Sequence, residues 1–117
     1  MRSRDPRQSL LDIVENIGLI EGYTAGMDQA AFSADRRTRD AVERCLQRVS
    51  EAAVRLGDRA SQLAPDLPWR KIRGIGNHLR HGYDVVEPEI IWNIVERDLL
   101  PLRAGCEAAL ARLPPPD

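Results

Sequence analysis

The chain is poor in aromatic residues and contains no long run of apolar residues. Aromatic side chains make up 4% of its 117 residues, which argues against a base-stacking platform for single-stranded nucleic acid. No apolar run approaches the length that spans a bilayer. Residues 1–6 lack the apolar core of an export signal. We therefore expect a cytoplasmic protein without a membrane segment.

Cysteine is also scarce, and the two that occur do not form a motif. Cys45 and Cys106 are far apart and match no spacing of metal ligands. Each falls among apolar helical positions, which favours small buried side chains over a disulfide or zinc ligands. His78 and His81 are three residues apart, but no acidic residue stands at helical spacing in that segment to complete a metal site. We expect no metal and no cofactor.

Charge of one sign is not in excess over the whole chain. The formal net charge of −1 argues against a general nucleic-acid coat protein, which is normally strongly basic. Between Asp66 and Asp84, however, there is no acid, and the basic residues are Arg70, Lys71, Arg73 and Arg80. This local patch suits a site that binds a few phosphates, although a solvated helix face would give the same pattern.

Helical spacing recurs along the chain, and no segment alternates as a strand does. The predicted helices run from Pro6 to near Gly22 or Gly26, over Met27 to Phe32, from Asp35 to Leu63, from Trp69 to His81, and from Pro88 onward. Pro101 predicts a kink or a break in the last of these. Residues 114–117 form a short proline-rich tail. We expect an all-α fold with one domain over residues 1–117, an antiparallel bundle of four to five helices.

The helix predicted from Trp69 to His81 holds both histidines and is amphipathic. At about 100° per residue, one arc of about 100° carries its polar groups, namely Arg73, Asn77, Arg80 and His81. Histidine can act as general acid or base near neutral pH, and arginine offers a rigid fork for phosphate oxygens. The set suffices for metal-free RNA cleavage. Gly74 and Gly76 form no phosphate loop and instead predict close backbone packing, for instance against a second copy of this helix.

The segment from Gly76 to Tyr83 resembles the motif of HepT-type toxins in the HEPN superfamily, which reads Arg, four to six residues, His, any residue, Tyr. The resemblance covers nearly the whole chain. Its other parts, in order, are Arg4-Asp5, Leu11-Asp12-Ile13, Tyr23, Phe32, Asp40-Ala41-Val42, Arg44, Leu46, Glu51-Ala52, Trp69, Ile90-Ile91-Trp92 and Asp98-Leu99-Leu100-Pro101.

The resemblance implies a HEPN-like bundle and a metal-independent endoribonuclease, the toxin of a type VII-like toxin–antitoxin pair. Such toxins form homodimers in which the motif helices of two subunits line one RNA-cleaving cleft. The antitoxin is a nucleotidyltransferase of the MNT type, which silences the toxin by AMPylation of the motif tyrosine. Carried over, His81 is the catalytic histidine and Tyr83 the modified residue. We assign Arg73 or Arg80 as phosphate clamp, Asn77 as orienting residue, and Arg70, Lys71 and His78 to substrate binding.

One position departs from the motif. The motif arginine should lie five residues before His81, where this chain has Gly76, and Arg73 has one residue too many between itself and His81. A second interpretation is therefore a non-catalytic helical partner that binds a nucleotidyltransferase or a nucleotide. A structural bundle unrelated to both is the third.

Overall fold

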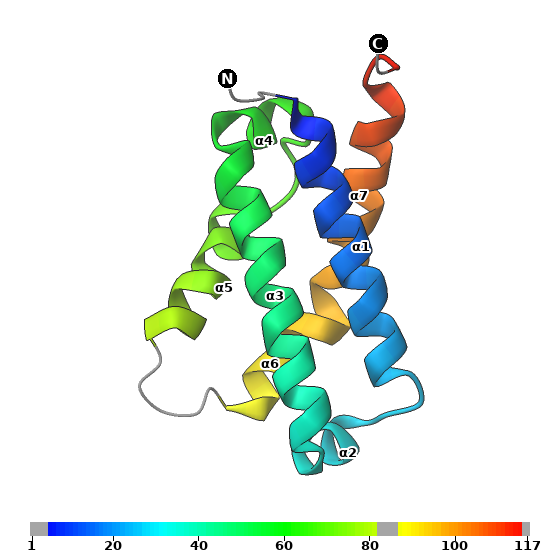
Figure 1. Ribbon diagram of the computed structural model, residues 1–117, viewed down its shortest axis with the longest axis vertical. Coiled ribbons are helices and arrows are strands. Elements are labelled where there is room, and N and C mark those ends of the chain that lie inside the picture. Colours follow the sequence, from blue (N-terminus) through cyan, green and yellow to red (C-terminus); the bar gives the residue numbers. More distant parts are fainter. Residues whose placement is uncertain (1–4, 82–86, 116–117) are drawn as a thin grey trace.

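The computed structural model describes residues 5–81 and 87–115, without the side chains of residues 77, 78, 80 and 81. All regular elements in these residues are helices, as predicted (Figure 1). They are α1 (Pro6–Thr24), α2 (Gln29–Ala34), α3 (Arg36–Leu56), α4 (Asp58–Leu63), α5 (Trp69–His81), α6 (Pro88–Arg97) and α7 (Leu99–Arg112). In this part of the chain no helix combines the length and hydropathy that crossing a membrane requires.

Three aspartates begin the first three helices by capping free backbone amides. The Asp5 carboxylate accepts from the Arg7 N–H at 2.9 Å, with Pro6 in the first turn of α1. Asp28 and Asp35 do the same for α2 and α3, at 2.8 and 3.1 Å. The hydrogen bonds to Thr38 hold the pKa of Asp35 below its ordinary value. The start of α1 at Pro6 agrees with the prediction.

Two predicted helices are each divided into two. The helix expected from Asp35 to Leu63 ends at Leu56, because Gly57 adopts φ +57° and closes α3 before α4 begins. The last helix breaks at Asp98, three residues ahead of Pro101, so that α6 and α7 are separate. Pro101 then stands in the first turn of α7, where a backbone N–H has no partner within the helix. The prediction of a break is confirmed, and its place is corrected.

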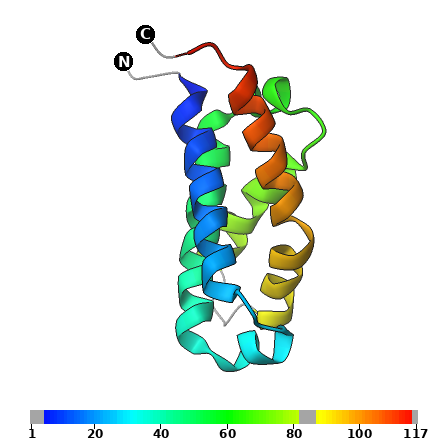
Figure 2. The ribbon, with the colours of Figure 1, turned by 90° about the vertical axis from the view of Figure 1, so that its right-hand side faces the viewer.

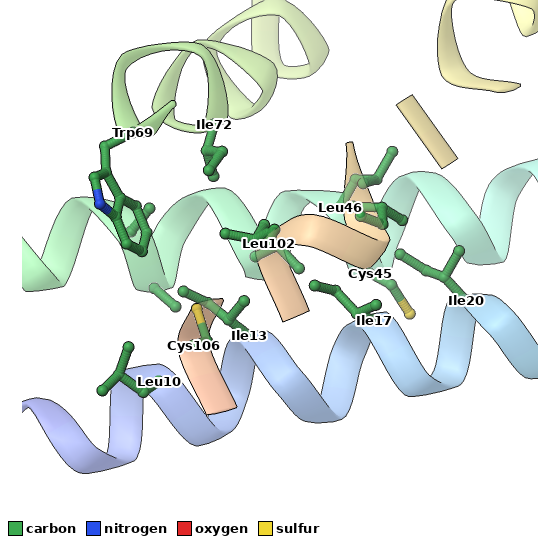
Figure 3. Packing of buried hydrophobic residues seen from close by; sticks show 14 of the residues in the cluster. Leu10, Ile13, Ile17, Ile20, Cys45, Leu46, Trp69, Ile72, Leu102 and Cys106 are labelled. Atoms are coloured by element: carbon green, nitrogen blue, oxygen red, sulfur yellow. The ribbon is translucent and has the colours of Figure 1, made fainter. Parts of the chain in front are cut away.

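The long helices α1, α3 and α7 run along the length of the bundle, and the start of α1 lies at the same end as the end of α7 (Figures 1 and 2). α1 packs on α3 and on α7, while α5 packs on α3. Figure 3 shows side chains from all four helices meeting in one apolar core. Within α1 the apolar residues Leu10, Ile13, Ile17 and Ile20 are each 0% exposed, whereas Leu11 is 41% exposed.

Both cysteines are free and buried, as predicted. Burial is the main reason that the thiol pKa values are raised, for Cys106 to about 12. Each thiol therefore stays protonated and behaves as a small apolar side chain.

Candidate functional site

The candidate site is built on α5, whose bounds the sequence predicted correctly. The helix starts at Trp69 after the segment from Ala64 to Pro68, and the Trp69 indole N–H donates to the Ala64 carbonyl at 2.8 Å. Trp69 and Ile72 are 3% and 2% exposed and turn into the core (Figure 3). The first half of α5 is therefore anchored by burial as well as by hydrogen bonding.

The second half of α5 carries most of the predicted chemistry. The backbone is helical through His81. The side chains of Asn77, His78, Arg80 and His81 lie outside the described residues, as does the whole of Tyr83. Their assigned roles stay predictions.

Arg73 has a structural partner. Its Nη2 donates to the carbonyl oxygen of Gly57 at 2.7 Å, at the end of α3. The Gly57 carbonyl also accepts from the Ala60 N–H at 3.2 Å. Arg73 therefore adds a second, charged donor at the C-terminus of α3, where a cation interacts favourably with the helix dipole. Arg73 thus joins the start of α5 to the end of α3.

The two neighbouring basic residues are both exposed. Lys71 Nζ lies 2.8 Å from Asp98 Oδ2, an ion pair between α5 and the junction of α6 and α7. For Arg70, the described part of the chain supplies no carboxylate within ion-pair distance. Among Arg70, Lys71 and Arg73, the three basic residues in the first half of α5, Arg70 is therefore the one most available to a phosphate.

Gly76 is buried and lies against α3. Its backbone N–H donates to the Ser50 hydroxyl at 3.0 Å, and the same hydroxyl donates to the Arg73 carbonyl at 2.9 Å. Close packing at Gly76 is confirmed, with α3 of the same chain as the neighbour. Gly74 differs, because a Cβ placed there would meet nothing within 4 Å in this chain.

Sequence reasoning missed Ser50, which is 1% exposed. The available signal was a lone hydroxyl within the apolar stripe of α3, between Val49 and Ala53. Buried hydroxyls are nearly always hydrogen-bonded, so a partner on an adjacent helix was to be expected.

A hollow of about 310 Å³ borders the side of α5 that faces α6. Its lining is almost entirely apolar and comes from α3, α5 and α6, namely Leu46, Lys71, Gly74, Ile75, Leu79, Ile90, Ile91 and Ile94. Ile90, at the start of α6, is 46% exposed. Among the described residues, those of the hollow included, no three or more His, Cys, Asp or Glu side chains are placed together to hold a metal ion.

Comparison with known proteins places this sequence in a family. Residues 13–109 match the family described as ribonuclease HepT-like. A Thermococcus cleftensis protein named "Probable ribonuclease HepT" is 32% identical over 104 residues, covering 89% of this chain and 94% of that protein. "Putative RNase MJ0127" of Methanocaldococcus jannaschii is 35% identical over 95 residues, covering 81% and 78%. No solved structure gives a significant match. With most of its length matched to that profile, the chain belongs to the ribonuclease HepT-like family.

Proposed function

We propose that this protein is a metal-independent endoribonuclease that acts as a homodimer, the toxin of a type VII-like toxin–antitoxin pair. The observation that carries the proposal is the family match over residues 13–109, together with a His-Gly-Tyr sequence at positions 81–83, at and just beyond the end of α5. RNA is the substrate, and its cleavage would take place in the cytoplasm.

The reaction is attack by a ribose 2′-oxygen on the adjacent phosphorus. The P–O5′ bond breaks, leaving a 2′,3′-cyclic phosphate and a 5′-hydroxyl. One His81 accepts the 2′-hydroxyl proton, and a second His81, from the other subunit, gives a proton to the leaving oxygen. A homodimer therefore supplies both the base and the acid that this chemistry requires.

Arg80 is the better of the two candidate phosphate clamps. The Arg73 guanidinium already donates to the Gly57 carbonyl, and moving it to a phosphate would break this contact with the end of α3. Asn77 orients the reacting groups, while Arg70, Lys71 and His78 bind more distant phosphates. Among these last three, Lys71 must exchange its ion pair with Asp98 to do so.

The apolar hollow supports a dimer interface beside α5. Ile75, Leu79 and Ile94 line it, and the half-exposed Ile90 stands at its edge. A second copy docked there would remove this apolar surface from water and bring two copies of α5 together. Sedimentation of wild type and Ile90→Glu tests this: we expect a dimer mass for the first and a monomer mass for the second. A monomeric wild type at micromolar concentration contradicts the proposal.

AMPylation of Tyr83 by an MNT-type nucleotidyltransferase is the proposed means of silencing. An AMP group would add negative charge beside the cleft and repel the RNA backbone. Incubation with the nucleotidyltransferase and ATP should add one AMP to wild type and none to Tyr83→Phe, measured by mass spectrometry.

Growth after induced expression tests the nuclease itself. Wild type should arrest growth and leave RNA fragments that end in 2′,3′-cyclic phosphate, while His81→Ala should do neither. His78→Ala is the matched control, since it removes the other histidine of α5 and should weaken substrate binding without abolishing cleavage. Harmless wild-type protein with intact RNA overturns the proposal.

One observation favours a second candidate, a non-catalytic helical partner of a nucleotidyltransferase or nucleotide. Gly76 replaces the motif arginine, and it is buried with its N–H bonded to Ser50. Under this alternative, His81→Ala leaves growth and RNA unchanged, and the complex with the nucleotidyltransferase still forms.

A further inference from the structure

A single buried hydroxyl links α3 to the helix that carries the candidate site. Ser50 lies in the middle of α3 and is 1% exposed. Its Oγ donates to the Arg73 carbonyl at 2.9 Å and accepts from the Gly76 N–H at 3.0 Å. One side chain is thus bonded to two backbone groups on another helix.

Two bonds of this kind constrain α5 more than one bond would. The Arg73 carbonyl and the Gly76 N–H belong to successive parts of one helical turn. Sliding α5 along its axis or rotating it about that axis lengthens at least one of the two distances. Gly76 is buried and carries no side chain, so its backbone is free to lie close to another helix.

Among the described side chains of α5, Lys71 pairs with Asp98 at the junction of α6 and α7, and few further polar contacts fix the helix on the bundle. Within the described residues, α3 is the helix on which α5 packs extensively. A further hydrogen bond, from Arg73 to the Gly57 carbonyl at the end of α3, holds the first half of α5. Of these contacts, the bond of Ser50 to Gly76 lies nearest in sequence to Asn77 and His81. His81 follows Gly76 by about 7.5 Å along a continuous helix.

We propose that Ser50 is a positioning residue for His81, acting through the register and rotation that its hydroxyl imposes on α5. The kinetic part of this proposal rests on the proposed ribonuclease function. Misplacement of a catalytic group by about 1 Å can lower rates by about a hundredfold. Loss of the hydroxyl should therefore reduce kcat while leaving KM nearly unchanged, because Ser50 is buried and contacts no substrate.

Four variants test the proposal. Ser50→Ala removes the hydroxyl, Ser50→Cys keeps its volume but bonds weakly, and Ser50→Thr keeps the hydroxyl. Ser9→Ala is the matched control. Ser9 is a buried serine of α1, 8% exposed, and its Oγ accepts a hydrogen bond at 3.4 Å from Nε of Arg55 on α3 rather than from α5. We expect kcat to fall about tenfold or more in the alanine and cysteine variants of Ser50. It should recover in the threonine variant and keep its wild-type value in Ser9→Ala.

Nuclear magnetic resonance gives a readout that does not depend on cleavage. The imidazole signals of His81, assigned with His78→Ala, should shift in Ser50→Ala and not in Ser9→Ala. Amide exchange over residues 77–81 should also become faster in Ser50→Ala alone. If the alanine and cysteine variants of Ser50 match Ser9→Ala in kcat, His81 signals and amide exchange, Ser50 contributes only to packing and the proposal is wrong. If wild type cleaves no RNA, the ribonuclease proposal fails, and the signals and exchange rates still decide the role of Ser50.

Discussion

The two flanks of α5 are built differently. The flank towards α3, here the closed flank, has buried Trp69 and Ile72 and the hydrogen bonds of Ser50 and Arg73. The flank towards α6, here the open flank, borders the 310 Å³ hollow. On this flank Lys71 forms an ion pair with Asp98, at the junction of α6 and α7.

This difference suggests that the closed flank of α5 serves stability and the open flank serves recognition. The closed flank holds α5 against the bundle through apolar burial and satisfied polar groups. The open flank leaves apolar area exposed, which folding alone gives no reason to keep. We therefore expect substitutions on the closed flank to change the free energy of unfolding, and those on the open flank to change association or binding.

The largest expected effect compares Ile72, on the closed flank of α5, with Ile90 of α6, which lines the hollow beside the open flank. Ile72→Ala removes a side chain that is 2% exposed and should lower the free energy of unfolding by about 2–4 kcal/mol. Ile90→Ala removes one that is 46% exposed and should cost less than about 1 kcal/mol. Urea unfolding at low protein concentration measures both without a contribution from dimerisation. Equal losses would show that the flanks do not differ in this way.

The next effect isolates the hydrogen bond at the end of α3. Arg73→Gln removes the donor to the Gly57 carbonyl and should lower the free energy of unfolding by about 1–2 kcal/mol. Arg70→Gln, the exposed neighbour, should stay within about 0.5 kcal/mol of wild type. The same urea experiment serves, and an Arg73 variant as stable as the Arg70 variant would contradict the capping role.

Two glycines give a smaller effect with opposite signs. At Gly74, on the open flank, a Cβ meets nothing within 4 Å, so Gly74→Ala should raise stability by about 0.5–1 kcal/mol through helix propensity. At Gly105 in α7, a Cβ would lie 2.6 Å from Leu67 Cδ1. Gly105→Ala should therefore lower stability by about 1 kcal/mol, because Leu67 must move. Thermal unfolding of both variants gives the signs, and a destabilised Gly74→Ala would show that the open flank is more closely packed than the structure has it.

Most of the fold could be predicted from the sequence, because local signals determine it. Proline, glycine and apolar periodicity placed the ends of α1 and α5, and they predicted a break in the last helix, although three residues beyond its actual place at Asp98. Gly57 was missed because the apolar rhythm continues through Ala60, so that only its positive φ marks the end of α3.

The site was less predictable, because its important contacts join residues far apart in the chain. The Ser50 hydroxyl bonds groups 23 and 26 residues away. Arg73 falls on the same helical arc as the candidate catalytic residues, yet it donates to the carbonyl of Gly57 at the end of α3. Helical periodicity assigns a side chain to a face, but it does not say which partner lies opposite that face.

The smallest effect concerns Glu43 on α3. Burial, aided by repulsion from Asp40, raises the pKa of this carboxyl above its ordinary value of 4.5. A carboxyl with a raised folded-state pKa stabilises the protein below its unfolded-state pKa, and this stabilisation is lost as the pH rises through the folded-state pKa. Glu43→Gln removes the charge, so it should raise Tm at pH 7, by less than Gly74→Ala does. The difference should disappear near pH 4, where wild type is itself protonated. Glu96→Gln, an exposed site on α6, is the control. A lower Tm for Glu43→Gln at pH 7 would mean that Arg39, whose charge opposes the shift, outweighs the cost of burial.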